Sequence, residues 1–182
     1  MYKRQNYDQW SKNDKNKFSI YASGQNTKRD SYYGGLGGGR TAEDSSLAIN
    51  AYGLTTDFSV VVGAQYNHYF KNSNVITLGI ENQVYHTEDE IAGYNRLVDQ
   101  QVNTTGLFAQ YEWKPTKKFT ALVGARYDIS AIDGIYRIQG IERSSDVNLG
   151  VFSPRTTLLY KINDNLRFRG GYARGFLSLI HI

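Results

Sequence analysis

The sequence predicts an all-β fold, an antiparallel up-and-down meander of about seven long strands that forms part of a transmembrane β-barrel. Three observations predict it. Apolar and polar residues alternate over long stretches, these stretches exceed the ~5–6 residues of an ordinary strand, and 182 residues include 15 Tyr but only 2 Pro. Proline is scarce in paired strands because it cannot donate a ladder hydrogen bond, whereas Tyr suits strands and membrane–water interfaces.

The alternation is clearest at residues 119–130 (FTALVGARYDIS), where Phe119, Val123 and Tyr127 share one face with other apolar residues. The same pattern recurs at 57–70 and 106–113. A tilted membrane strand needs ~9–11 residues, and the predicted strands are longer than this. They lie at about 15–29, 54–70, 74–87, 102–114, 117–131, 146–162 and 165–176.

The predicted connections alternate between long and short. Long loops are expected at 30–53, 88–101 and 131–146, and short turns at 71–73, near Pro115 and at 163–165. In a meander every second connection lies at the same end, so the long loops gather on one side, as in bacterial barrels. Aromatic residues beside the short turns predict a girdle at the membrane interface: Tyr69, Phe70, Trp113, Phe119, Tyr160 and Phe168.

Composition excludes several other classes of protein. The net charge of +4 has no clustered basic stretch, so nucleic acid is not an expected partner. The chain has no Cys, which excludes disulfides and cysteine metal sites. No apolar run reaches ~18 residues, and the mean hydropathy of −0.52 excludes a helical membrane protein but not a barrel. The first residues lack the apolar region of a secretion signal, so we expect the beginning to be missing.

No pattern predicts an enzyme, a cofactor or a metal site. The glycine-rich residues 34–40 lack the lysine and the following helix of a phosphate loop, so a surface loop is expected there. His68, His86 and His181 lack metal-ligand spacing, and no nucleophile motif surrounds the serines.

Two groups of residues are candidates for contact with other molecules. The polar face of the strands is expected to line a hydrated lumen or to contact an internal plug, and Gly63, Gly79 and Gly124 on that face are expected to let the wall bend. Its candidates are Gln65, Glu81, Gln110, Glu112, Arg126, Asp128, Arg155 and Arg169. The long loops supply exposed candidates for ligand binding, which are Tyr32, Tyr33, Tyr94, Arg96 and Tyr136.

Several segments resemble TonB-dependent outer-membrane receptors of the Bacteroidetes type. They are 29–35 (RDSYYGG), 51–53 (AYG), 62–66 (VGAQY), 93–96 (GYNR), 108–114 (FAQYEWK) and 123–128 (VGARYD). The most specific are 153–155 (SPR), 158–160 (LLY) and 169–176 (RGGYARGF). The resemblance runs from about Lys15 to Phe176, where such receptors continue with Arg-Ala-Pro and this chain does not.

The resemblance implies a partial barrel domain at 6–176. The ends at 1–5 and 177–182 look like translated adapter sequence, and we expect them to be non-native. It implies a barrel of about 22 strands closed by a plug, located in the cell outer membrane. The implied function is TonB-coupled uptake of a scarce solute such as a ferric siderophore, cobalamin or haem. The implied partners are membrane lipid, the plug, the TonB complex and the solute, either a small molecule or a metal chelate.

Two alternatives predict the same strands. A passive pore or an adhesive barrel differs by lacking a plug. A soluble β-sandwich binding module requires a second sheet to cover the aliphatic residues of the first, which are Val60, Val62, Leu107, Ala109, Ala121 and Val123.

Overall fold

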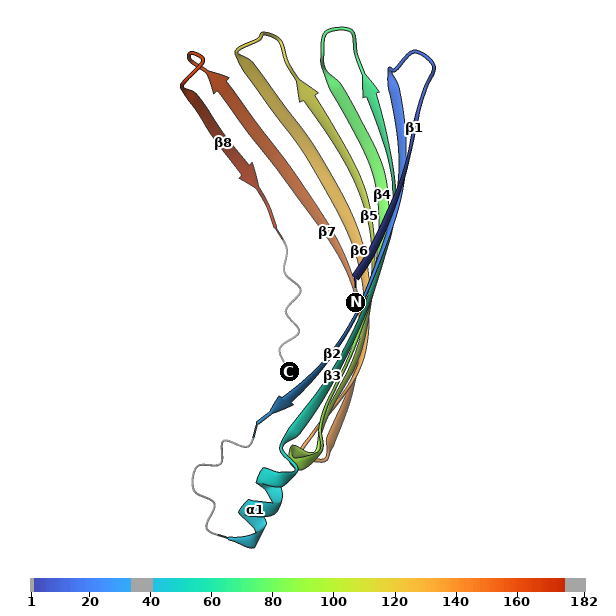
Figure 1. The fold of residues 1–182 in the computed structure, drawn as a ribbon, viewed down its shortest axis with the longest axis vertical. Helices are drawn as coiled ribbons and strands as arrows, with labels where there is room; N and C mark the ends of the chain where they lie inside the picture. Colours follow the sequence, from blue (N-terminus) through green and yellow to red (C-terminus); the bar gives the residue numbers. More distant parts are fainter. Residues whose placement is uncertain (1, 34–40, 176–182) are drawn as a thin grey trace.

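The computed structural model describes residues 2–33 and 41–175, which form one antiparallel sheet in the order β1-β2-β3-β4-β5-β6-β7-β8 (Figure 1). The strands are β1 (Tyr2–Trp10), β2 (Asn16–Tyr32), β3 (Tyr52–Tyr69), β4 (Val75–Ile91), β5 (Arg96–Trp113), β6 (Phe119–Ile138), β7 (Ile141–Lys161) and β8 (Arg167–Ala173). Helix α1 (Ala42–Ile49) lies between β2 and β3, and the 3-10 turn η1 (Ala92–Tyr94) lies between β4 and β5. The meander is therefore confirmed.

The seven predicted strands correspond to β2–β8, and β1 was not predicted. Its residues, YKRQNYDQW, are mostly polar on both faces, so the period-two signal is absent although β1 pairs with β2 along its whole length. Residues 2–5 pair within this strand, and residues 177–182 lie outside the described part, so the non-native character of the two ends stays a prediction.

Two of the three predicted long loops are wrong. Strands β4 and β5 continue through 88–101 to the turn at η1, and β6 and β7 continue through 131–146 to a hairpin at Gln139 and Gly140. Both hairpin residues have positive φ, 51° and 83°, as a tight type I′ turn requires. The regular alternation of the apolar band ends before 88–101 and 131–146, and this change predicts loops. Strands that extend beyond the membrane, however, need no apolar convex face.

The third long connection and the short turns are confirmed. The chain leaves β2 at Tyr32 and re-enters at Tyr52, and residues 34–40 of this connection, including the glycine-rich run, lie outside the described residues. The short turns gather at the opposite end of the sheet, with the β1–β2 turn added to the predicted set (Figure 1, top). The strict alternation of long and short connections does not hold.

The sheet is a curved single layer, and its two faces differ (Figure 1). Residues paired across strands point to the same face, so the registers assign every strand position to one of the two faces. On one face side chains crowd together: Thr55 and Asn67 of β3 are buried, whereas Phe58, Val62 and Tyr66 on the other face are exposed. We name these the concave and the convex face.

The convex face carries an apolar band that no layer of the described chain covers. Val62, Leu107 and Val123 are 48%, 56% and 54% exposed. Ala109 is also exposed, Val60 is half-buried, and Ala121 is buried opposite the larger Trp113 and Leu158. The exposed band excludes the soluble sandwich for the described residues, because a sandwich covers such a face with a second sheet. It includes Phe18, Ile20, Val62, Leu78, Ile80, Leu107, Val123, Tyr127, Ile129, Phe152 and Leu158.

Aromatic residues border this band at the short-turn end. Phe70 packs edge-on against Tyr111 with ring centroids 6.4 Å apart, and Trp113 packs edge-on against Phe119 at 6.1 Å. Tyr160 and Phe168 are paired and exposed on β7 and β8. Tyr69 departs from the predicted girdle, because it faces the concave side and stacks on Trp10 at 5.5 Å.

Within the complete barrel, Val123→Arg is expected to lower the free energy of unfolding by about 2–4 kcal/mol, because it places a cation on the lipid face near the middle of the band. Leu122→Arg is the matched control, since Leu122 points to the concave face one residue away, and we expect it to cost below about 1 kcal/mol. Unfolding in lipid vesicles with urea measures both. Equal losses for the two variants would contradict the assignment of faces.

The isolated 182-residue chain is not expected to insert into a membrane as a stable monomer. Strands β1 and β8 each have one edge without a partner strand among the described residues, and unpaired backbone groups cost several kcal/mol each in lipid. The measurement is refolding into detergent, followed by protease treatment and electrophoresis with and without heating. Protease-resistant, heat-modifiable migration of the monomer would refute this expectation.

Candidate functional site

The concave face contains all eight residues predicted to line a lumen. The registers place each of them on the same side as Tyr21 of β2. They come from β3 to β8, so they extend across most of the sheet. They are Gln65, Glu81, Gln110, Glu112, Arg126, Asp128, Arg155 and Arg169. The structure shows their position on one face and leaves their role as a prediction.

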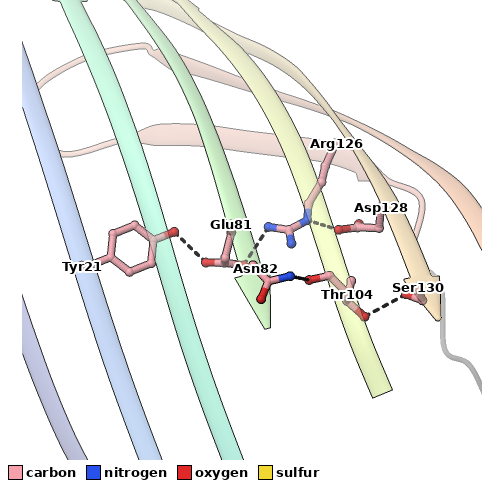
Figure 2. A network of polar contacts seen from close by, with 7 residues as sticks. All are labelled: Tyr21, Glu81, Asn82, Thr104, Arg126, Asp128 and Ser130. Atoms are coloured by element: carbon pink, nitrogen blue, oxygen red, sulfur yellow. Dashed lines mark hydrogen bonds and ion pairs between the residues drawn. The ribbon is translucent and has the colours of Figure 1, made fainter. Parts of the chain in front are cut away.

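Glu81 lies at the centre of a polar network that joins β2, β4 and β6 (Figure 2). The Tyr21 hydroxyl donates to Glu81 Oε2 at 2.6 Å, and Arg126 Nη1 donates to Glu81 Oε1 at 3.0 Å. Arg126 Nε also donates to Asp128 Oδ1 at 2.7 Å. We name these four residues the central network. Both carboxylates accept charge-assisted hydrogen bonds, which are stronger than neutral ones.

Two glycines allow the central network to reach across strands. The register aligns Tyr21, Gly63, Glu81, Gly106 and Asp128 in one row, with a large residue and a glycine in alternation. A Cβ on Gly63 would overlap the Tyr21 ring, and a Cβ on Gly106 would overlap the Arg126 guanidinium. Each glycine therefore leaves space for a side chain from the neighbouring strand to lie over it. Making room for a neighbouring side chain is a different role from the bending of the wall that is predicted for Gly63.

The other predicted lining residues make smaller contacts. Gln65 donates to Asn67 Oδ1 at 3.1 Å, Arg155 donates to Gln110, and Glu112 forms an ion pair of 2.9 Å with Lys114. Arg169 lies exposed on β8. Two hollows of about 520 and 360 Å³ flank Glu81, the first toward β1 and the second toward β7. The concave face thus offers polar groups on both sides of the central network.

A second set of polar side chains lies on the concave face, near the end of the sheet where α1 is found. Arg29, Tyr33, Thr55, Asp57, Tyr85, Thr87, Asp89 and Arg96 line a hollow of about 400 Å³, and we name them the rim cluster. Thr55 donates to Asp89 Oδ1 at 2.6 Å and accepts from Arg29 at 3.3 Å. Arg96 lies 3.6 Å from Asp89, while Asp57 accepts from Tyr85 at 2.9 Å and from Thr87. Cationic, acidic and phenolic groups therefore converge at this edge.

The base of the connection between β2 and β3 is fixed against η1. The Tyr33 amide donates to the Ala51 carbonyl and the Gly93 amide to the Asn50 carbonyl, both at 2.8 Å. The Tyr94 hydroxyl donates to the Tyr33 carbonyl at 3.1 Å. Helix α1 begins with a capping box between Thr41 and Asp44. These bonds bring Tyr33 and Tyr94 together beside Arg96.

A polar sheet face opposite an uncovered apolar band is the arrangement of a membrane barrel wall, and comparison with known proteins is decisive. The family described as "TonB dependent receptor-like, beta-barrel" matches residues 2–178. The chain belongs to this family. No match to the curated proteins was found.

Solved receptors of this kind share the fold at low sequence identity. The ferric-catecholate import receptor Fiu of E. coli K12 superposes with a TM-score of 0.60 at 11% identity, covering 94% of this chain and 32% of that one. The ferric citrate transporter FecA gives 0.64 at 15% identity, covering 93% and 26%. FpvAI in its complex with pyocin S2 gives 0.59 at 13% identity, covering 94% and 25%. The chain spans a third or less of these receptors.

In this TonB-dependent receptor domain, the structure brings some of the predicted ligand candidates together. Tyr33 and Arg96 belong to the rim cluster, and the Tyr94 hydroxyl contacts the Tyr33 carbonyl. Tyr32 faces the convex side and packs against Tyr52, with ring centroids 4.9 Å apart. Tyr136 is not a loop residue as predicted: it lies in β6, is 6% exposed, and its hydroxyl has no partner among the described residues.

Sequence reasoning missed several residues of these groups. Tyr21 was left out because only long polar side chains were assigned to the lumen, although its position in an alternating strand places it there. Tyr85 lay on a predicted strand, and Asp89 was placed in a loop that the structure replaces with β4. Period-two counting, extended past the apolar segment, would have found Arg29, Asp57, Tyr85 and Asp89.

Neither histidine of the described residues forms a metal site. His68 contacts Asn16 at 2.6 Å and His86 contacts Asp99 at 2.8 Å, both on the convex face. Within 2–33 and 41–175, no group of three His, Asp or Glu residues is placed to hold a metal ion. The same residues include no helix long and apolar enough to cross a membrane. Family and fold are those of transport receptors, and the lack of enzymatic activity stays a prediction.

Gly63→Ala in the complete receptor is expected to lower the free energy of unfolding by about 1–2 kcal/mol, because the new Cβ displaces Tyr21 from Glu81. Gly24→Ala is the control on the neighbouring strand. The Cβ that Ala adds at position 24 would meet no atom closer than 3.9 Å. Since Ala has less backbone freedom to lose on folding than Gly, the free energy of unfolding should stay unchanged or rise slightly. Unfolding with urea measures the free energy of unfolding of both variants. A Gly63→Ala variant as stable as the unchanged receptor would contradict the role proposed for Gly63.

Proposed function

We propose that this chain is part of the barrel wall of an outer-membrane receptor that takes up a scarce solute by TonB-coupled active transport. The observation that carries the proposal is the family match over residues 2–178, on a sheet with an apolar convex and a polar concave face. The convex band contacts membrane lipid, and the complete receptor closes into a barrel of about 22 strands. The solute is a ferric siderophore, cobalamin or haem.

The concave face supports two roles in the proposed receptor. The central network and its neighbours line the lumen and contact the plug. Contact with the plug requires polar side chains on the wall that are held in place. The network meets this need, since Glu81 receives donors from two strands. The rim cluster, together with the neighbouring Tyr94, contacts the solute at the outer mouth, because phenol and guanidinium groups offer both hydrogen bonds and apolar surface.

The central network also suits a wall beside a moving domain. In the energised step the plug changes conformation and admits the solute, so the wall must keep its own geometry while its partner shifts. Hydrogen bonds from Tyr21 and Arg126 to Glu81 tie three strands across the concave face. A wall that is connected in this way keeps its surface while contacts to the plug break and reform.

The test is expression of the complete gene in an outer membrane without competing receptors, with and without TonB. We expect uptake of radiolabelled iron from a ferric catecholate or ferric citrate, or uptake of cobalamin or haem, to require TonB and an energised inner membrane. A passive pore would give uptake that is independent of TonB. Such uptake, or a complete gene that encodes no plug-like domain, would reject the proposal.

A further inference from the structure

The short turns at one end of the sheet carry an excess of lysine. They span residues 11–15, 70–74, 114–118 and 162–166. Their carboxylates are Asp14 and Asp164, whereas their cations are Lys12, Lys15, Lys71, Lys114, Lys117 and Lys118. At the opposite end the convex face has the reverse balance, because its carboxylates outnumber the cations there. The two ends of the sheet therefore carry charge of opposite sign.

The lysines of two neighbouring turns have no carboxylate partner among the described residues. Lys71 lies in the β3–β4 turn, Lys117 and Lys118 lie in the β5–β6 turn, and all three are exposed. None of them forms an ion pair there, whereas Lys114 pairs with Glu112. Both turns have paired strands on either side, so they lie away from the open edges of the sheet. We name Lys71, Lys117 and Lys118 the turn lysines.

Polar contacts fix the two turns against each other. Asn74 is 4% exposed, and its side-chain amide donates to the Tyr111 hydroxyl at 2.8 Å. The same side chain accepts from the Lys114 amide at 2.8 Å, which joins the β3–β4 turn to the β5–β6 turn. Within the second turn, the Thr116 hydroxyl accepts from the Phe119 amide at 3.1 Å. Because the backbone of both turns is held, the three lysines are already gathered when a common partner binds.

The turn lysines adjoin the lipid-facing side of the wall. Phe70, Tyr111 and Trp113 border the apolar band beside the two turns and are 42%, 39% and 47% exposed. Aromatic residues at the end of such a band mark the depth at which hydrocarbon meets the lipid headgroups. Lys71 follows Phe70 directly in the sequence, and Lys118 directly precedes Phe119. The ammonium groups of the turn lysines therefore lie at the level of the headgroups.

We propose that the turn lysines form a docking surface for the headgroup of an anionic phospholipid, in the membrane leaflet at the short-turn end. The lipid phosphate contacts the ammonium groups, and the acyl chains extend along the apolar band past Phe70 and Trp113. Lysines beside a membrane gain free energy from an anionic leaflet. A lipid is favoured over an acidic protein, because the apolar band and its aromatic border place acyl chains beside these lysines.

The inference goes beyond the proposed function. It requires only that the wall lies in a membrane, and it is independent of the solute. The carboxylates at the opposite end of the convex face repel the same anionic headgroups. The charge difference between the two ends thus matches the wall to one orientation between two unlike leaflets.

The test uses the complete receptor in phosphatidylcholine vesicles that contain a phosphatidylglycerol with a photoreactive group near its phosphate. Illumination and mass spectrometry of peptides identify the labelled residues, and competition with unlabelled lipid gives the relative affinity at each position. We expect labelling at 70–74 and 114–119, with competition by phosphatidylglycerol but not by phosphatidylcholine. Lys117→Gln combined with Lys118→Gln should weaken the affinity for phosphatidylglycerol there by about five- to thirtyfold. Arg at both positions should retain the affinity, and added salt should lower it.

Lys28→Gln combined with Arg137→Gln is the matched control. Both residues lie on the convex face at the opposite end of the sheet. This variant loses the same charge as the test variant and should leave labelling of the two turns unchanged. Heat-modifiable migration checks that each variant is folded.

Three outcomes would overturn the inference. They are equal losses of affinity in the two double variants, equal labelling by a phosphatidylcholine analogue, and unchanged affinity after Lys117→Gln with Lys118→Gln. None of them bears on whether uptake requires TonB, so each leaves the proposed function intact.

Discussion

The backbone hydrogen-bond ladder is the constraint on which the rest of this structure depends. A single layer of strands in a membrane has no water to satisfy its N–H and C=O groups, so each strand must pair along its length with the next. Strands β2–β7 pair almost without interruption from one end to the other. Since the ladder continues past the apolar band, the same strands that cross the membrane also form the rim.

The ladder also decides which side chains can meet. A slip of one residue between two strands would exchange their faces, so the central network exists only because the register is held across β2, β4 and β6. Its contacts join residues 60 and 45 positions apart in sequence. Gly63 and Gly106 make these contacts possible, since any larger residue in that row would separate Tyr21 and Arg126 from Glu81. Packing on the concave face thus reinforces the register that creates it.

Sequence patterns were informative wherever one face of a strand is apolar. The alternation at 57–70 and 119–130 predicted β3 and β6 and placed Gln65, Arg126 and Asp128 on one face, which the registers confirm. The patterns failed in β1, where both faces are polar, and in the rim portions of β4–β7, where apolar residues no longer keep to the convex face. In β6, Ile132 and Tyr136 are buried on the concave side, and Asp133 lies on the convex side. Tyr136 was misplaced for this reason. The central network could not be predicted, since a single strand's pattern contains no register.

The rim portions of the strands carry an excess of carboxylates on their convex side. In the apolar band, the convex side excludes charge, so acids and bases are restricted to the concave side. Beyond the band both faces are free to carry charge, yet only the convex face is one-sided there. On the concave rim Arg29, Arg96 and Arg143 are nearly balanced by Asp57 and Asp89, whereas carboxylates outnumber the convex cations Lys28 and Arg137 and are Asp30, Glu88, Glu90, Asp99, Asp133, Glu142 and Asp146. Solubility alone does not require this separation, because mixed charges on either face would serve it equally well.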